Sequence, residues 1–153
     1  MLTIQVKITG NEQLIAKLRR LNLGLLDFTE PLKAIGEELK SYYSNQVFAS
    51  QGGVLGVRWP TLAASTMLYK AKHYAQYATV PLIRTGTMKD NFKSTVTPRT
   101  LAITNPTPYF VYHQSSAART KIPYRPMMGI NQDAKEIVER ILRADIQALI
   151  EGA

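Results

Sequence analysis

Few side chains in this sequence have a type and spacing that could carry out chemistry. The two histidines, His73 and His113, stand forty positions apart. Neither has another histidine or a carboxylate nearby at the spacing of a metal-ligand set. Glu37 and Glu38 are neighbours on an expected helix, where successive side chains point about 100° apart, so they do not form an acid–base pair by themselves. The histidines and this glutamate pair therefore predict neither a metal site nor a catalytic dyad.

The remaining candidate nucleophiles and acids are equally isolated. Asp90 is the only carboxylate between residues 39 and 132, so a two-carboxylate centre would need contributions from distant helices. Ser115 and Ser116 lack the context of a nucleophile elbow. The chain contains no cysteine, which removes thiol nucleophiles, thiolate metal sites and disulfides together. The sequence predicts a protein that is not an enzyme and that carries no cofactor or metal.

Positive charge is concentrated in the middle of the chain. Its 153 residues include 19 Lys or Arg and 11 Asp or Glu, for a net charge of +8. Residues 51–126 hold ten of the basic residues and one acid, whereas residues 127–153 hold three basic and five acidic residues. A block of one sign favours a polyanionic partner or an acidic patch on a neighbouring subunit. It is equally typical of a solvated surface that aids solubility.

The first third of the chain is expected to form a strand and two helices. Apolar and polar side chains alternate over residues 2–9, which is typical of a half-buried strand. Asn11 is placed to cap an amphipathic helix that ends near residue 25. A second helix should begin with Thr29 as its N-cap and continue to about Phe48.

The next stretch is predicted to be a loop followed by a short helix. Residues 51–56 are rich in glycine, but no strand precedes them and no Gly-Lys-Ser/Thr follows, so a flexible loop is expected rather than a phosphate loop. Thr61 should cap a helix that runs to about Lys72. Tyrosines and lysines interleave over residues 69–77, as on a stacking surface for single-stranded nucleic acid. They would not share one compact face, which argues against that function.

The second half contains a predicted hairpin and a long helix. Residues 87–92 should form one or two helical turns, and Lys93–Thr97 and Thr100–Thr104 two strands joined by a turn. Tyr109–Gln114 has β-rich propensity but is too short to assign by periodicity. Apolar residues recur at helical spacing over residues 134–150, so an amphipathic helix of about five turns should pack against the sheet.

These elements predict an α+β fold in one domain that spans residues 1–153. A mainly antiparallel sheet would be packed by the N-terminal helices and the long C-terminal helix, with long loops between. No apolar run approaches the ~18 residues of a membrane span, so no membrane partner is expected. A cysteine-free chain can fold in a reducing cytoplasm.

Short motifs follow one another through the middle of the chain, and their order and spacing are more specific than any one of them. They are Phe48, Gly52, Gly56, Trp59-Pro60, Leu62, Thr66, Lys70, Leu82, Thr85-Gly86, Met88, Tyr109, His113-Gln114 and Ile122-Pro123-Tyr124-Arg125-Pro126. Through these residues, over 48–130, the chain resembles the phage virion morphogenesis family, which comprises Mu-like and P2-like tail-completion proteins. It departs from the pattern at Ser115-Ser116-Ala117, where glycine is expected, and at Ala63, where serine is usual.

The resemblance implies a structural virion protein of the head–tail junction, acting as a neck, tail-terminator or tail-completion protein. Such proteins form rings around the DNA passage, here with six copies preferred and twelve possible. The implied partners are other copies of the chain, neighbouring neck and tail-tube proteins, and viral DNA, contacted without sequence preference. The implied location is the virion, at the neck or proximal tail, after assembly in the host cytoplasm.

Within this interpretation, some basic residues of the middle segment are expected to face the DNA channel or an acidic neighbour. The candidates are Arg58, Lys70, Lys72, Lys89, Arg119 and Lys121. Trp59 is expected to anchor the core of its own chain. For Arg125, an intramolecular clamp on a carboxylate or carbonyl and an assembly contact remain open.

Two other classes of function stay open. A sequence-independent nucleic-acid-binding module of phage origin would explain the basic middle segment, and it predicts tight, salt-sensitive binding by the free monomer. A small regulatory or toxin-like enzyme would require a polar cluster that this sequence does not single out.

Overall fold

A computed structural model describes residues 3–7, 12, 15–16, 27–117 and 121–151. Most of the helix expected after Asn11 lies outside the described residues. The described strands are β1 (Thr3–Lys7), β2 (Lys93–Val96) and β3 (Thr100–Thr104). The described helices are α2 (Thr29–Ser41), α3 (Ala64–His73), α4 (Thr87–Asp90), α5 (Phe110–Gln114) and α6 (Gln132–Glu151). The π-helical segment η1 (Tyr42–Val47) and the 3₁₀ turns η2 (Gly53–Leu55) and η3 (Ala75–Tyr77) complete the described elements.

The three described strands form one antiparallel sheet in the order β1–β3–β2. In β3, Ile103 stands opposite Ile4 of β1, and Leu101 stands opposite Val96 of β2. Leu101 and Ile103 are fully buried, while their neighbours in the strand are half-buried, as expected for a strand with one covered face. The predicted α+β class, the N-terminal strand and the hairpin are confirmed.

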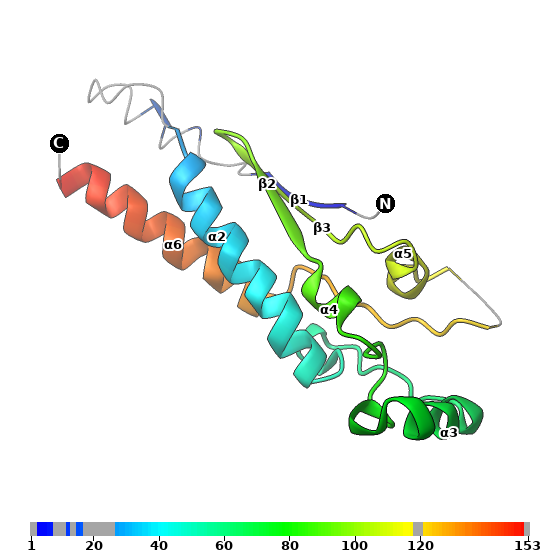
Figure 1. The fold of residues 1–153 in the computed structure, drawn as a ribbon. Helices are drawn as coiled ribbons and strands as arrows, with labels where there is room; N and C mark the ends of the chain where they lie inside the picture. Colours follow the sequence, from blue (N-terminus) through cyan, green and yellow to red (C-terminus); the bar gives the residue numbers. More distant parts are fainter. Residues whose placement is uncertain (1–2, 8–11, 13–14, 17–26, 118–120, 152–153) are drawn as a thin grey trace.

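Helix α2 supplies the layer that covers the sheet (Figure 1). Its Leu32, Ile35 and Leu39 are buried at helical spacing in the same core cluster as the β3 side chains. Thr29 is the first residue of this helix and not its cap, which corrects the prediction. The carboxylate of Asp27 provides the capping acceptor instead, because it accepts a hydrogen bond from the Thr29 backbone N–H at 2.8 Å.

The helix continues past Ser41 as the π-helical segment η1, close to the predicted end. Tyr42 and Tyr43 are buried in this segment, and both hydroxyl groups have partners. The Tyr43 hydroxyl donates to the Gly129 carbonyl at 2.8 Å, and the Tyr42 hydroxyl lies between Asn131 and Asp133. The tyrosines therefore join η1 to the segment that leads into α6.

Helix α6 runs antiparallel to α2 and packs on it, not on the sheet as predicted (Figure 1). The physical reason is that α2 already occupies the sheet face, so only the other side of α2 is left for α6. Ala134 is the one residue in the described part of α6 that is fully buried. The larger apolar residues of the predicted stripe, from Ile137 to Ile146, are only partly buried against the core. The stripe therefore contributes less burial than its sequence suggested.

The apolar segment before residue 115 is helical, although its residues favour strands. In α5, the Phe110 N–H donates to the Thr107 carbonyl at 3.0 Å and the Ser115 N–H to the Val111 carbonyl at 3.0 Å. Phe110 is 1% exposed and meets Phe92 edge-to-face at 6.0 Å between ring centroids. Core packing thus decides the conformation of this segment over local propensity.

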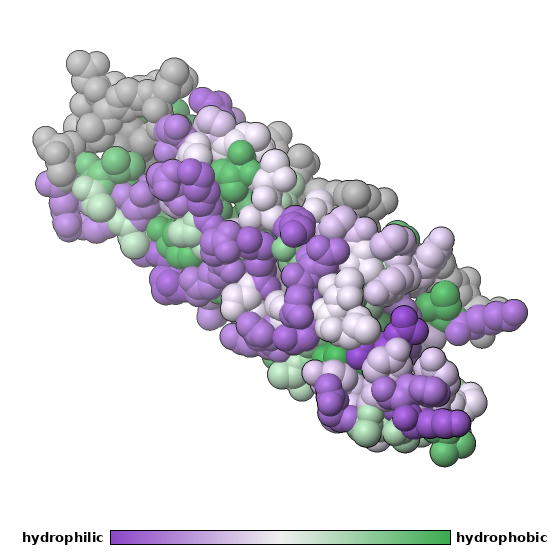
Figure 2. Space-filling model, viewed as in Figure 1, coloured by the Kyte–Doolittle hydropathy of each residue, from purple (hydrophilic) through white to green (hydrophobic). Residues whose placement is uncertain are grey.

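Helix α3 lies at one end of the elongated molecule, away from α2 and α6 (Figure 1). It begins at Ala64 with Ala63 in the cap position and no side-chain cap, so the prediction that Thr61 caps it is wrong. Leu68 and Tyr69 of this helix are 73% and 52% exposed, and hydrophobic residues are visible at this end of the surface (Figure 2). No helix in the described ranges is long and apolar enough to span a membrane.

Candidate functional site

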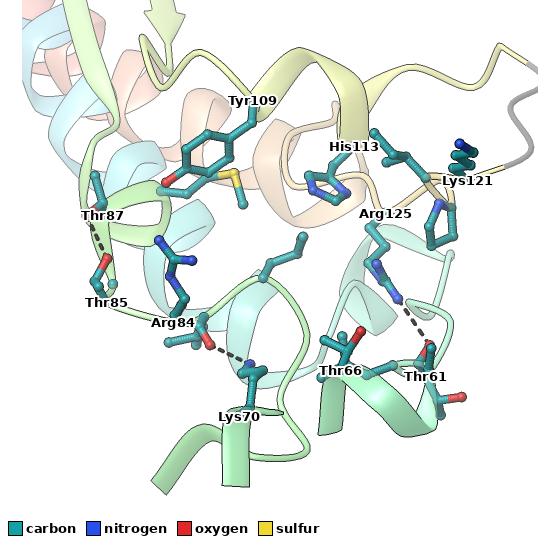
Figure 3. A pocket seen from close by; sticks show the side chains of 18 residues that line it. Thr61, Thr66, Lys70, Arg84, Thr85, Thr87, Tyr109, His113, Lys121 and Arg125 are labelled. Atoms are coloured by element: carbon teal, nitrogen blue, oxygen red, sulfur yellow. Dashed lines mark hydrogen bonds between the residues drawn. The ribbon is translucent and has the colours of Figure 1, made fainter. Parts of the chain in front are cut away.

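The candidate site is an open cleft of about 800 Å³ that brings motif residues from distant parts of the sequence together (Figure 3). Helix α3 and the residues before it form one wall, residues 82–88 a second, and α5 with residues 121–125 a third. Twelve of the motif residues line it: Leu62, Thr66, Lys70, Leu82, Thr85, Gly86, Met88, Tyr109, His113, Ile122, Pro123 and Arg125. Motif residues outside the lining, such as Trp59 and Gln114, hold nearby backbone groups.

The glycine-rich stretch is a hydrogen-bonded turn, which corrects the prediction of a flexible loop. Gly52 and Gly56 adopt φ angles of +81° and +80°, in the left-handed region that side-chain-bearing residues rarely occupy. The Gly52 N–H donates to the Val47 carbonyl at 2.9 Å, and the Trp59 N–H donates to the Gln51 carbonyl at 2.7 Å. The turn thereby directs the chain from the end of the long helix back to Trp59.

Trp59 is the anchor of this turn, as predicted. It is 3% exposed and meets the Phe48 ring edge-to-face at 5.1 Å between centroids. Its indole Nε1–H donates to the Pro126 carbonyl at 2.7 Å. Trp59 thus joins the glycine-rich turn to Pro126, at the end of the last motif segment.

Arg125 is an intramolecular clamp on backbone carbonyl groups, which resolves the alternatives left by the sequence. Its Nε and Nη2 donate to the Pro60 carbonyl at 3.0 and 2.9 Å, and Nη2 also donates to the Thr61 carbonyl at 3.1 Å. Arg125 is buried, and this burial lowers the pKa of its guanidinium. These bonds fix the segment that leads into α3.

Gln114 holds the same region from the α5 side. Its Oε1 accepts hydrogen bonds from the N–H groups of Met127 and Met128 at 2.8 and 3.1 Å, and its Nε2 donates to the Met128 carbonyl at 2.7 Å. One amide side chain therefore satisfies three backbone groups, as a neighbouring strand would. The motif marked Gln114 as important, but its sequence context did not indicate this role.

Lys70 is not an exposed basic group, which corrects its assignment to a DNA channel or subunit contact. The residue is 6% exposed, and its ammonium donates to the carbonyls of Val80 and Ile83 at 2.5 and 2.6 Å. Burial, with a smaller contribution from Arg125, lowers the pKa of its ammonium. Lys70 therefore ties α3 to the backbone of residues 80–83.

The other predicted basic residues are distributed over the surface. Arg58, Lys72 and Lys121 are exposed, and only Lys121 of these three lines the cleft. Lys89 is half-buried, with its ammonium 3.4 Å from Asp90 Oδ1. Arg119 lies outside the described residues.

Arg84 is a cleft cation that the sequence interpretation missed. It is exposed, and its guanidinium carbon lies 5.7 Å from the centroid of the Tyr74 ring. Tyr69 contacts His73 at 4.5 Å between ring centroids. The aromatic residues around α3 are thus partly paired within the chain and do not form an open row for stacking on bases.

His113 lies in the cleft wall with one nitrogen unsatisfied. Its Nδ1 is buried and has no hydrogen-bond partner among the described residues. The imidazole ring does form a hydrogen bond with the backbone of Pro123. Burial lowers the pKa of the imidazole, and the nearby Arg125 guanidinium lowers it further, whereas the Pro123 bond acts in the opposite direction.

This lowered pKa predicts a pH-dependent stability. Below about pH 6.5 the unfolded chain takes up a proton at His113 before the folded chain does, so the free energy of unfolding should fall as the pH decreases. Denaturant unfolding at pH 7.5 and pH 5.5 should show this loss in the wild type, and His113→Gln should reduce it. The exposed His73 provides a control, because His73→Gln should retain the loss. An identical loss in wild type and His113→Gln would contradict the interpretation.

The carbonyl clamp gives a second prediction. Arg125→Met keeps most of the apolar stem but removes every donor to Pro60 and Thr61, so it should lower the free energy of unfolding by about 2–3 kcal/mol. Arg58→Met, at an exposed arginine, should change it by less than about 0.5 kcal/mol. Urea unfolding of the three proteins measures both effects. Equal stability of Arg125→Met and the wild type would rule out the clamp as a structural element.

The lining of the cleft suits the binding of an anionic group. Among the described residues, no group of three His, Asp or Glu side chains gathers in a way that could hold a metal ion. The lining of the cleft combines cations, threonine hydroxyl groups and apolar side chains, and none of its described residues is Asp or Glu. Such a surface can bind an anionic group with apolar contacts around it.

Comparison with known proteins identifies one relationship. The model of the phage virion morphogenesis family matches residues 6–147 of the chain. No curated protein and no solved structure matches it. The matched range contains the glycine-rich turn, the Arg125 and Gln114 clamps and every described wall of the cleft.

Proposed function

The chain belongs to the phage virion morphogenesis family, and from that premise we propose that it is a structural protein of the head–tail junction. It acts at the neck or the proximal end of the tail, as a terminator or completion protein, and forms a ring of six copies, or of twelve, around the DNA passage. Its partners are other copies of itself and the adjoining neck and tail-tube proteins. It catalyses no reaction.

One observation carries this proposal: the motif residues serve to build a surface. Trp59, Gln114 and Arg125 each hold backbone groups around one cleft, and none of them is hydrogen-bonded to an acid, base or nucleophile among the described residues. A protein that acts by docking needs a fixed surface of this kind. The predicted absence of catalytic groups agrees with the same function.

Deletion of the gene in its phage tests the proposal. A junction protein is required to join or complete the particle, so the deletion should yield separate or unjoined heads and tails in electron micrographs, and expression of the chain in trans should restore joined particles. Normal infectious particles from the deletion phage would contradict the proposal. So would a defect confined to DNA replication.

Contact with DNA is expected to be independent of sequence. Arg58, Lys72 and Lys121 are exposed and able to neutralise phosphate charges, which carry no base information. Unrelated duplexes should therefore bind with similar affinity, and raising the salt from 50 to 200 mM should weaken both by the same factor. A marked preference for one duplex would favour the alternative of a regulatory nucleic-acid-binding module.

A further inference from the structure

The cleft contains an uncompensated positive charge. Its described lining includes five residues that carry or can take up a proton to become cations: Lys70, Arg84, His113, Lys121 and Arg125. The ion pairs among the described residues involve Lys33, Lys40, Lys89 and Arg140, all of them outside this lining. None of the described residues that line the cleft supplies a carboxylate to balance these positive groups.

The hydrogen bonds of the two buried cations do not remove this imbalance. Lys70 and Arg125 donate to backbone carbonyls, which satisfy their N–H groups but bring no negative charge. Burial, and after it the guanidinium of Arg125, lowers the pKa of both Lys70 and His113, so a positive charge on either group is disfavoured beside Arg125. An anion that enters the cleft would relieve this repulsion.

The groups that remain available suit carboxylates on a protein better than phosphates on a duplex. Arg84 and Lys121 are the exposed cations of the lining, whereas binding to duplex DNA uses many phosphate contacts. Leu62, Ile83 and Ile122 line the same space. A cavity of about 800 Å³ with this mixed lining fits a few side chains of a protein surface.

The chain carries a second surface with an excess of negative charge. A groove of about 870 Å³ runs along α6 beside Glu38 of α2 and residues of η1, and its lining holds four carboxylates, among them Glu136 and Glu139, against Arg140 and Arg143. Arg140 is paired with Glu38, so three carboxylates remain against one arginine. Glu136 and Glu139 are exposed, stand about one helical turn apart, and take part in no ion pair among the described residues. The cleft and the groove have no lining residue in common: the cleft is lined by α3, α5 and the segments 82–88 and 121–125, and the groove by α6, Glu38 and residues of η1.

We propose that the cleft of one subunit binds the carboxylates of Glu136 and Glu139 on α6 of a second copy. Arg84 and Lys121 receive them at the mouth of the cleft. Two different surfaces meet in this contact, so it is heterologous and repeats from copy to copy until a ring closes. The inference rests on the proposed function, because it specifies the contact that builds the ring.

A charge exchange tests the contact. Arg84→Glu with Lys121→Glu places two carboxylates at the mouth of the cleft and cancels its net positive charge, and Glu136→Lys with Glu139→Lys makes the groove basic. Each double variant alone should remain folded by circular dichroism and self-associate at least tenfold more weakly than the wild type in sedimentation velocity runs. An equimolar mixture should recover association, because the two introduced glutamates then meet the two introduced lysines and the unchanged cleft meets the unchanged groove. Arg58→Glu with Lys72→Glu is the matched control, since these cations are exposed but do not line the cleft, and it should change association less than twofold.

Several outcomes would overturn the proposal: a mixture that stays dissociated, a control that weakens association as much as the cleft variant, or a wild type that remains monomeric up to millimolar concentration. A cleft variant that loses affinity for duplex DNA but associates normally would assign the cleft to DNA instead. Each of these results could occur with the protein at the head–tail junction, since the deletion phenotype tests that location separately.

Discussion

Replacing Trp59 by alanine should lower the free energy of unfolding by about 3–5 kcal/mol, a large part of the stability of a domain of this size. The indole is 3% exposed, packs edge-to-face on Phe48, and donates the bond at 2.7 Å that ties the glycine-rich turn to Pro126. Alanine leaves a cavity and an unpaired carbonyl at the same place. Equilibrium unfolding in urea, followed by far-ultraviolet circular dichroism, measures the loss.

Trp59→Phe separates the two contributions. Phenylalanine keeps an aromatic ring beside Phe48 but cannot donate to the Pro126 carbonyl, so it should cost about 1–3 kcal/mol. A Trp59→Ala protein within 1 kcal/mol of the wild type would show that the turn is held by other contacts.

Replacing Gly52 by alanine should cost about 2–5 kcal/mol. The backbone has φ +81°, which is unfavourable for alanine by about 1–2 kcal/mol. A Cβ atom there would lie 2.3 Å from the Val57 carbonyl oxygen and 2.5 Å from Trp59 Nε1, so the turn or the indole must shift, and such overpacking adds about 1–3 kcal/mol. Thermal and urea unfolding of the purified variant provide the measurement.

Gly56→Ala is the matched control for this substitution. Gly56 has nearly the same angle, φ +80°, but a Cβ atom would meet nothing within 4 Å. Only the conformational cost of about 1–2 kcal/mol should therefore appear. Equal losses at the two glycines would mean that the contact with Trp59 does not restrict Gly52.

The local sequence pattern correctly predicted the elements in which apolar residues alternate along a strand or recur at helical spacing over several turns. The hairpin of β2 and β3 and the helix α6 have such patterns, and the structure places them close to the predicted bounds. The helical start at residue 29 was predicted with the wrong cap, because the Asp27 carboxylate is an equally suitable acceptor two residues earlier. Short-range sequence signals do not decide between neighbouring caps.

The packing of the elements could not be derived in the same way. The apolar stripe of α6 required a partner, but nothing in its sequence indicated that α2 rather than the sheet would provide it. Asn131 caps this helix by accepting from the Ala134 N–H at 3.0 Å and also donates to Tyr42 and Val54. Such multiple roles depend on tertiary neighbours.

For the site, the family motif identified the residues but not their tasks. Lys70 is a long basic side chain in a basic segment, so its sequence suggested a surface contact, whereas the fold surrounds it with carbonyl oxygens. Arg84 was overlooked because it stands among the motif residues without being one of them. Leu82, two residues earlier, has φ +62°, a backbone conformation that is rare for a non-glycine residue and that the sequence does not indicate.

Electron cryo-microscopy of the assembled particle tests the central claim most directly. We expect density for this chain as a closed ring at the neck or the proximal end of the tail, with the DNA passage at its centre. The absence of the chain from purified particles, or its presence only outside the junction, would contradict that claim.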